Sequence, residues 1–113
     1  MAEAMLMGKP VVATGYSGNM EFMNEDNSLL VDYKLVKLGE PIPPYEADYE
    51  WAEPSEDHAA NLLRRLYDEP SFARELGLKA KIDAVGRLSV SEAGRRIAAR
   101  LIEIEASRSK GDA

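Results

Sequence analysis

Hydrophobic residues near the start of the chain form two short runs without polar alternation. Residues 11–14 (VVAT) and 28–33 (SLLVDY) consist mainly of aliphatic side chains. Such runs are typical of strands that are buried on both faces, as in a parallel sheet. A helix-favouring segment, residues 2–7, precedes the first run and is closed by Gly8 and Pro10. The pattern predicts an alternating α/β order of helix, strand, turn and strand.

Two short strands are too small a sheet to cover both their faces and their edges. The expected pair therefore needs neighbours, either from chain upstream of Met1 or from a second copy. The sequence also opens within a helix-favouring segment, with the acid Glu3 placed as if it belonged to a binding site. We expect the chain to be a piece of a larger protein.

Residues 34–54 have a different composition. The segment contains four prolines (Pro41, Pro43, Pro44, Pro54), five acids (Glu40, Glu46, Asp48, Glu50, Glu53) and three aromatic residues (Tyr45, Tyr49, Trp51). Each proline removes a backbone donor and disfavours helix just before it. We therefore expect a long ordered loop that is held down by its aromatic side chains.

Helical patterning fills the rest of the chain. Ser55 is a favourable N-cap, with Glu56 and Asp57 in the first turn. A second helix is expected from about residue 71, with Gly86 near its end. The expected inward faces are Ala59, Leu62, Leu63, Leu66 and Tyr67 in the first helix, and Phe72, Leu76, Ala80 and Ile82 in the second.

A capping box of Ser89 and Glu92 predicts the start of a third helix. The expected organisation is then an α/β segment with its loop (1–54), a helical segment (55–107) and a disordered tail (108–113).

Composition and charge indicate one small soluble globular domain. The 113 residues are 45% hydrophobic and 30% charged, with a net charge of −6. Residues 1–57 hold three bases and twelve acids, whereas residues 58–113 hold eleven bases and eight acids. The acidic front half excludes a nucleic-acid-binding protein, which needs a basic footprint. The arginines of the rear half recur at helical spacing and indicate a solvated helix face.

Several further classes are excluded by what the sequence lacks. Without cysteine there is no disulfide, cysteine zinc site or thiol catalysis. No apolar run approaches the roughly 20 residues that span a bilayer. The first residues lack the basic region of a signal peptide. We expect a cytoplasmic protein without a transmembrane segment.

Candidate chemistry is sparse. His58 has no nucleophile or acidic partner placed by the sequence, so we interpret it as solvated or hydrogen-bonded. The acidic loop lacks the spacing of a calcium loop, and no metal site is predicted. The turn GYSGN, residues 15–19, is neither a G-x-G-x-x-G motif nor a P-loop. Its glycines either permit positive φ or let the backbone approach a ligand closely.

Glu3 is a stronger candidate because a strand and a glycine-rich turn follow it. Open parallel sheets bind ligands in the crevice beyond the carboxyl ends of their strands. A carboxylate there can accept two hydrogen bonds from the vicinal hydroxyls of a ribose. A solvated helix residue remains an equal alternative.

Residues 3–33, EAMLMGKPVVATGYSGNMEFMNEDNSLLVDY, resemble the nucleotide-sugar-binding half of family-4 (group 1) glycosyltransferases of the GT-B fold. The family motif reads approximately E-A-M-A-x-G-x-P-V-V-A-T-x-x-G-G-x-x-E, and Ser17 replaces the first glycine of the usual pair. The following segment, to about residue 70 and including WAEP, is similar to one bacterial branch. The matching residues are Glu3, Ala4, Met5, Gly8, Pro10, Val11, Val12, Ala13, Thr14, Gly18 and Glu21.

This resemblance implies a truncated C-terminal part of a GT-B, Rossmann-like domain, with two short parallel strands, a long loop and three helices. Residues 1–54 would be the partial nucleotide-sugar-binding segment. Glu3 matches the second glutamate of the family's Glu, seven residues, Glu pattern, which binds the ribose hydroxyls. Gly15, Ser17 and Gly18 would line the donor cleft, and Glu21 would be structural or line the cleft.

The resemblance also implies the activity of the parent protein. A retaining enzyme of this family transfers a sugar from a nucleotide-diphosphate sugar to a saccharide or lipid-linked acceptor, without a metal or other cofactor. The first glutamate would fall about six positions before Met1. The basic residues that hold the diphosphate and the acceptor domain would also lie outside the chain. We therefore assign no catalytic residue and expect the isolated chain to be inactive.

Two further expectations concern partners. The apolar faces of the strands and helices should drive self-association, with a homodimer as the simplest result. The other implied partner is the missing N-terminal portion of the parent enzyme, which would be cytoplasmic or membrane-associated. The alternative function is a stand-alone, non-enzymatic oligomeric module for interaction or regulation, derived from the transferase fold.

Overall fold

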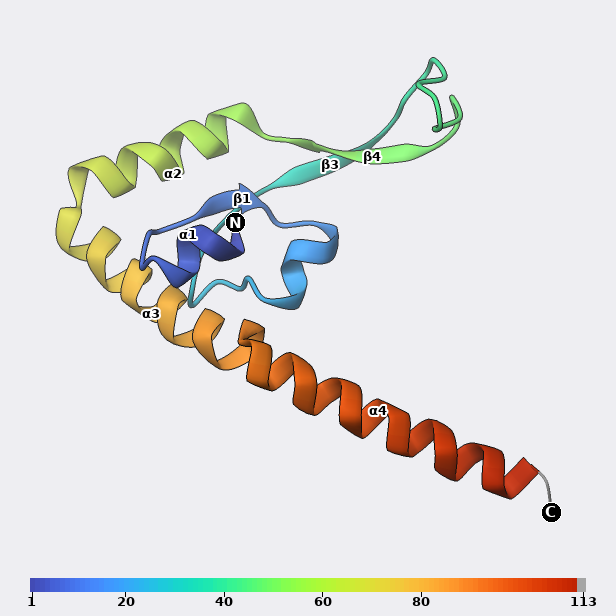
Figure 1. Ribbon diagram of the computed structural model, residues 1–113. Helices are drawn as coiled ribbons and strands as arrows, with labels where there is room; N and C mark the ends of the chain where they lie inside the picture. The colour runs from blue at the N-terminus through green and yellow to red at the C-terminus, as the bar shows by residue number, and fades with distance from the viewer. Residues whose placement is uncertain (112–113) are drawn as a thin grey trace.

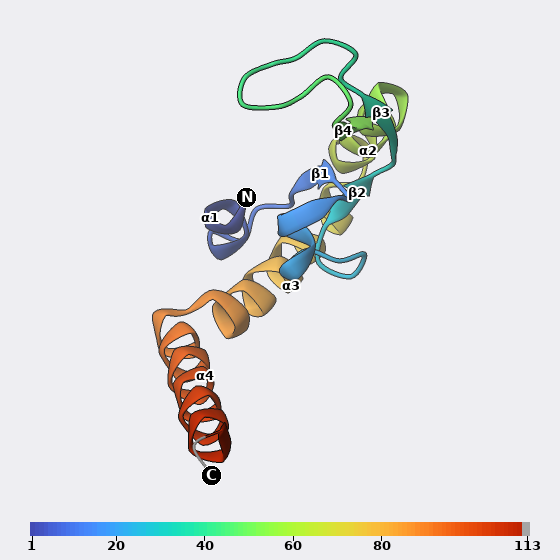
Figure 2. The ribbon, with the colours of Figure 1, turned by 90° about the vertical axis from the view of Figure 1, so that its right-hand side faces the viewer.

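The computed structural model describes residues 1–111, and Figure 1 shows an open arrangement around a small centre. The hairpin of β3 and β4 and the long helix α4 extend away from this centre in different directions (Figures 1 and 2). In chain order the elements are α1 (Ala2–Leu6), β1 (Val12–Thr14), the 3-10 helix η1 (Ser17–Glu21), β2 (Leu29–Val31), β3 (Tyr33–Lys37), β4 (Glu50–Pro54), α2 (Glu56–Asp68), α3 (Pro70–Leu88) and α4 (Val90–Gly111).

Strands β1 and β2 form a two-stranded parallel sheet, with Ala13 opposite Leu30. The predicted mixed α/β structure with two short parallel strands is therefore confirmed, although each strand is shorter than the run that predicted it. The chain enters β1 through a turn at Gly8, whose φ of 71° is left-handed.

The core is small and draws on segments far apart in the sequence. Its central cluster consists of Met5, Val11, Met23, Ala80 and Ala84. Helix α1 packs against α3, and Gly77 of α3 lies directly against the backbone of the Gly8 turn. The short helix thus depends on α3 for cover, whereas the strands also pack against α2.

A buried polar cluster fixes the turn before β2. The side-chain amide of Asn27 donates to the carbonyl oxygen of Phe22 at 3.0 Å and to Oδ2 of Asp83 at 2.8 Å. Its Oδ1 accepts from the backbone N–H of Asn24 at 2.8 Å. Because Asp83 belongs to α3, the turn is tied to the same helix as the core.

The predicted long loop over residues 34–54 is wrong at both ends. Residues Tyr33–Lys37 and Glu50–Pro54 pair as the antiparallel strands β3 and β4. In the register, Lys34 lies opposite Glu53, and Lys37 lies opposite Glu50. These opposite charges favour pairing across strands. Three of the four prolines lie in the connection and Pro54 ends β4, so none interrupts the ladder.

The helices begin as predicted but bury less than predicted. Oγ of Ser55 accepts the backbone N–H of His58 at 3.2 Å, which confirms this N-cap. Helix α3 starts at Pro70, where the missing donor costs nothing. Three residues expected to face inward are instead exposed, because no element covers that side of their helices: Leu63, Tyr67 and Ile82.

The capping box at the start of α4 is half formed. Oγ of Ser89 accepts the backbone N–H of Glu92 at 3.2 Å. The Glu92 carboxylate does not return to Ser89, because it binds Arg95 and Arg96 at 2.7 and 2.8 Å. Helix α4 continues to Gly111, through positions 108–111 that were expected in the tail. Residues 112–113 of that tail lie outside the described residues.

The molecule exposes far more surface than a compact domain of its size. Its radius of gyration is 19.1 Å, against about 13 Å for a compact chain of 113 residues. Its accessible surface is 8505 Å², against about 6,200 Å² for a folded monomer of this mass. Within residues 1–111, no helix has the length and apolar character needed to cross a membrane.

Candidate functional site

A cavity of about 490 Å³ opens at the carboxyl end of β1. This is the edge at which parallel sheets bind ligands. Its walls combine the end of β1, the turn that follows it, the first residue of the chain and one strand of the hairpin. The lining residues are Met1, Ala13, Thr14, Tyr16, Asn19, Trp51 and Ala52.

The turn between β1 and η1 is fixed by side-chain contacts. Nδ2 of Asn19 donates to the carbonyl oxygen of Thr14 at 3.0 Å, which closes the turn. The ring of Tyr16 packs on that of Tyr33, with 4.9 Å between centroids and 58° between planes. Trp51 reaches the same cavity from β4 and is half exposed. The cavity therefore presents aromatic rings beside two small polar side chains.

The backbone conformation of the glycine-rich turn differs from the one that its sequence suggests. Ser17, and not Gly15 or Gly18, has the left-handed φ of 71°. Gly15 lies in a tight place, because a Cβ there would be 3.3 Å from Cβ of Leu30. Its N–H donates to the carbonyl oxygen of Val31 at 3.0 Å, extending the parallel ladder. Around Gly18 the space is open.

The four residues predicted to bind the donor are not gathered in one cavity. Gly15 lines a second, neighbouring cavity of about 390 Å³ together with Leu30 and Tyr33. Ser17 and Gly18 lie in the turn between Tyr16 and Asn19 but line neither cavity. Glu3 is exposed on α1, with its carboxylate 3.7 Å from the N-terminal amine. Glu21 is exposed at the end of η1.

Two residues of the β1 cavity, Tyr16 and Trp51, were not predicted as site residues. Tyr16 belongs to the turn that the sequence singled out. Trp51 was interpreted only as an anchor for a loop. Its place beside Thr14 follows from the pairing of β3 with β4.

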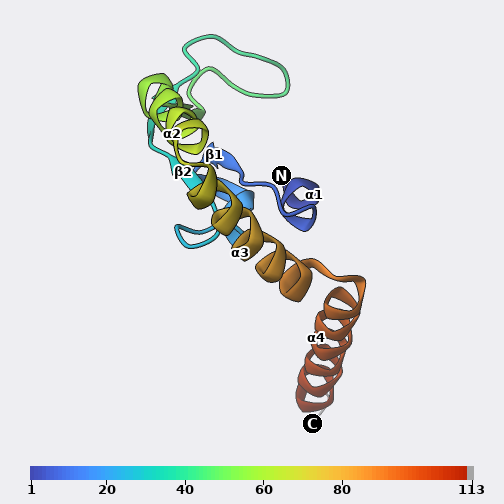
Figure 3. The ribbon, with the colours of Figure 1, turned by 90° about the vertical axis from the view of Figure 1, so that its left-hand side faces the viewer.

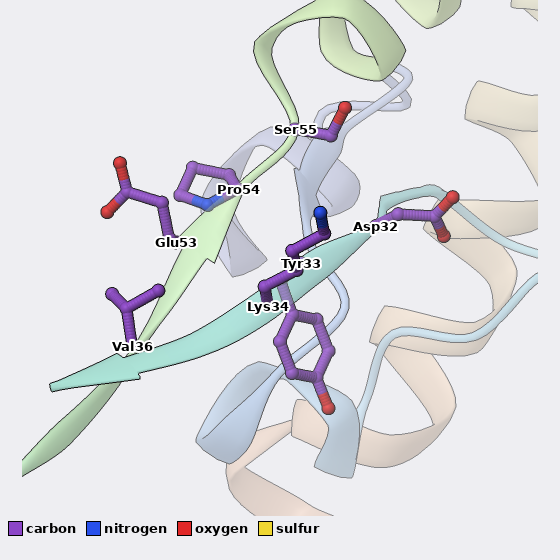
Figure 4. A pocket seen from close by; sticks show the side chains of 7 residues that line it. All are labelled: Asp32, Tyr33, Lys34, Val36, Glu53, Pro54 and Ser55. Carbon is purple, nitrogen blue, oxygen red and sulfur yellow. The ribbon is translucent and has the colours of Figure 1, made fainter.

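A third cavity, of about 450 Å³, lies where the hairpin meets α2 (Figure 4). Asp32 precedes β3 and Ser55 precedes α2, while Lys34 and Glu53 are partners in the register of the hairpin. Here the backbone N–H of Ser55 donates to the carbonyl oxygen of Asp32 at 2.8 Å. This cavity therefore marks the joint between the hairpin and α2, and Asp32 in its wall directly follows the carboxyl end of β2.

His58 stabilises the same joint. Its Nδ1 accepts the backbone N–H of Asp32 at 3.0 Å and lies 3.1 Å from Oδ2 of that residue. One nitrogen cannot serve both contacts at once: Nδ1 accepts the N–H when it carries no hydrogen and donates to the carboxylate when it carries one. The interpretation of His58 as a hydrogen-bonded structural residue agrees with this geometry.

The strongest electrostatic perturbation lies outside these cavities, at the start of α4. Hydrogen bonds from Arg95 and then Arg96 lower the pKa of Glu92 from 4.5 to about 2. The same carboxylate raises the pKa of Arg95. Across the described chain, residues 1–111, no three histidine, aspartate or glutamate side chains are grouped so that they could hold a metal ion. The metal-free chemistry implied by the resemblance stays a prediction.

Comparison of the chain with protein-family models, with curated proteins and with solved structures finds no match. A function is therefore inferred from the motif, the parallel strands and the cavity beside them.

Proposed function

We propose that the chain is the C-terminal part of the nucleotide-sugar-binding domain of a retaining GT-B glycosyltransferase of family 4. The parent enzyme transfers a sugar from a nucleotide-diphosphate sugar to a saccharide or lipid-linked acceptor in the cytoplasm. The observation that carries this proposal is the parallel pairing of β1 with β2, with an aromatic cavity at the carboxyl end of β1. The motif similarity of residues 3–21 supports it independently.

In this proposal the β1 cavity receives the donor. The rings of Tyr16 and Trp51 offer flat apolar faces to a base or a sugar, and stacking of this kind is worth about 1–3 kcal/mol per base. Thr14 and Asn19 supply hydrogen-bonding groups at the turn. Glu3 would accept the ribose hydroxyls, as the resemblance implies.

The chain alone binds the donor weakly and does not transfer sugar. Departure of a nucleoside diphosphate leaves negative charge that cationic groups or helix N-termini must stabilise. No side chain that lines the β1 cavity is basic, and the N-terminal amine of Met1 would be a peptide nitrogen in the parent. The parent supplies those groups, together with the acceptor domain, from its N-terminal portion.

The coding sequence before Met1 tests this proposal directly. We expect the reading frame to continue upstream and to encode a glutamate six positions before Met1. An in-frame stop codon next to a ribosome-binding site at Met1 would contradict it.

Ligand entry can be followed through the one tryptophan of the chain, Trp51. We expect uridine or guanosine diphosphate to change its fluorescence with a midpoint at or above about 1 mM, equivalent to about 4 kcal/mol of binding. Inorganic pyrophosphate, which has no ring to stack, is the matched control and should change nothing. A midpoint far below 1 mM would show that the isolated site is already complete.

The alternative is a non-enzymatic oligomeric module, and the large exposed surface is the observation that favours it. Both functions share one proposal, that the chain associates with itself through exposed apolar faces to form a homodimer. Light scattering at micromolar concentration tests this part. A monodisperse monomer would refute it and leave the donor-site proposal standing.

A further inference from the structure

Helix α4 carries an apolar stripe with the spacing of a coiled coil. Val90, Gly94, Ile97, Leu101 and Ile104 follow one another at intervals of four, three, four and three residues. Alternation of four and three places side chains along one seam of a helix. The four larger side chains of this seam are between 41% and 91% exposed. We call these five residues the α4 seam.

The seam is exposed because α4 leaves the rest of the molecule. Its first turn packs near α3, and the remainder projects away from the sheet and from α2 (Figures 1 and 3). The charged pairs of this helix lie off the seam: Glu92 holds Arg95 and Arg96, and Arg100 holds Glu103 at 2.8 Å. One side of α4 is therefore apolar, and its charged pairs lie on the other sides.

We propose that the α4 seams of two copies of this chain pack against each other as a parallel coiled coil. This inference deepens the self-association proposed above and rests on it. It is independent of the donor site.

The residues beside the seam favour the parallel orientation. When seam residues 94 and 101 are a positions, Ala93 and Arg100 take g, and Ala98 and Glu105 take e. In a parallel pair each g residue meets the e residue five positions later in the partner helix. Ala93 of one helix then lies beside Ala98 of the other, and Arg100 lies beside Glu105. In an antiparallel pair centred on Ile97, Arg100 would instead lie level with Gly94 and gain no partner.

The molecule as a whole exposes enough additional surface for a stable interface, and the seam is one part of that surface. The molecule exposes about 2,300 Å² more than a folded monomer of its mass. Stable interfaces bury about 1,200–2,000 Å² in total. The exposed apolar side chains of α3 closest to α4, Ile82, Val85 and Leu88, add to the apolar surface that the seam begins.

The seam residues are compatible with two or more copies. β-Branched residues at d with leucine at a favour more than two strands in parallel coiled coils. Here only Leu101 is a large a residue, since Gly94 is the other. A dimer mass and a tetramer mass in light scattering both support the parallel α4 contact, and a monomer mass overturns it.

Because the chain has no cysteine, single substitutions report orientation directly. We expect Ile104→Cys to form a disulfide-linked dimer under mild oxidation, since the same residue of two copies meets in a parallel pair. Val90→Cys should behave in the same way. If each variant alone stays unlinked while the Val90→Cys, Ile104→Cys double variant is linked, the helices are antiparallel and the proposal is overturned.

A matched pair of variants distinguishes an effect of the seam from an effect of general hydrophobicity on association. Leu101→Asp places a charge in the seam and should lower the association constant at least about tenfold, equivalent to 1.4 kcal/mol. Ile102→Asp changes the next residue, which is 66% exposed and lies off the seam, and should leave association unchanged.

As a control for folding, the circular dichroism spectra of both variants should show the helix content of the unmodified protein. Equal loss of association in the two would overturn the seam assignment. Association that neither variant weakens would show that another surface joins the copies, and this would overturn the inference while leaving self-association itself intact.

Discussion

Gly77 sets the distance between α3 and the start of the chain. A Cβ at this position would overlap the carbonyl oxygen of Gly8 and lie 3.3 Å from the backbone nitrogen of Pro10. Both neighbours are backbone atoms, so neither can rotate out of the way. The core residues Met5 and Val11, which flank this turn, reach Ala80 and Ala84 only because α3 comes this close.

Gly77→Ala should therefore destabilise the protein although alanine is the better helix former. We expect a loss of about 1–3 kcal/mol in the free energy of unfolding, measured by urea denaturation, because the insertion forces the backbone apart. Gly86→Ala is the control in the same helix. No atom lies within 4 Å of its Cβ position, so it should stabilise by about 0.5–1 kcal/mol. Equal effects of the two substitutions would contradict the close contact.

At this scale the sequence located the important turn but not the role of each residue in it. The glycines of GYSGN suggested left-handed backbone or close approach, and the left-handed residue is Ser17. Gly15 avoids Leu30, which is a tertiary contact that local sequence does not contain. The bond from Asn27 to Asp83 spans 56 residues, so no local pattern indicates it.

At the scale of elements, the start of α2 shows how one cap fixes a joint. Ser55 caps the helix through the N–H of His58, and the His58 ring binds the backbone of Asp32. The cap thus connects α2 to the residue between the end of β2 and the start of β3.

Ser55→Ala should cost about 1 kcal/mol of stability, the usual effect of losing a serine N-cap. Thermal unfolding followed by circular dichroism measures it. Ser71→Ala is the control, since that hydroxyl accepts only from the exposed side chain of Arg74, and its melting temperature should not change. An unchanged melting temperature for Ser55→Ala would contradict the capping role.

The lowered pKa of Glu92 predicts an acid-sensitive start of α4. A carboxylate whose folded pKa lies below its unfolded value stabilises the folded state above the unfolded pKa and loses that effect as the pH falls. For Glu92 the window runs from pH 4.5 down to about 2.

Glu92→Gln should lower the melting temperature at pH 7, and the difference from the unmodified protein should shrink as the pH is taken through that window. Glu103→Gln, which loses a single exposed arginine contact, is the control and should show a smaller difference at every pH. A difference for Glu92→Gln that stays constant down to pH 2 would be evidence against the lowered pKa.

Elements were predicted best where a local signal specifies them. The buried runs before and after η1 indicated strands, and the Ser55 cap indicated a helix start. The hairpin was missed because prolines and acids dominate its composition, although Tyr33–Lys37 alternates in character. Its register depends on residues 13 to 21 positions apart that carry opposite or apolar side chains. Inward helix faces were overestimated, since periodicity shows that a face is apolar but not that anything covers it.

At the scale of the whole molecule, open shape is the dominant property. A radius of gyration of 19.1 Å and extents of 62 × 41 × 19 Å leave most apolar residues of α3 and α4 in contact with solvent. Composition predicted a globular domain and gave no sign of this shape. The prediction of exposed apolar faces came instead from the number of strands, because two strands cannot cover both faces of their own sheet.

If copies associate, stability must depend on concentration. The melting temperature should rise over about a hundredfold increase in chain concentration, because association stabilises the folded state by mass action. Differential scanning calorimetry of the unmodified protein and of Leu101→Asp measures this, and the rise should be smaller for the variant. A melting temperature that does not change with dilution would argue for a monomer.

The bond between Asn27 and Asp83 has a consequence for the order in which the protein is built. During synthesis β1 and β2 leave the ribosome before α2, which packs against both strands, and well before α3, which supplies part of the core and the acceptor for Asn27. Until about residue 84 has emerged, the strands lack the α3 side of their core. Each strand is therefore made before the residues that secure it, so a nascent chain exposes the sheet until α3 has emerged.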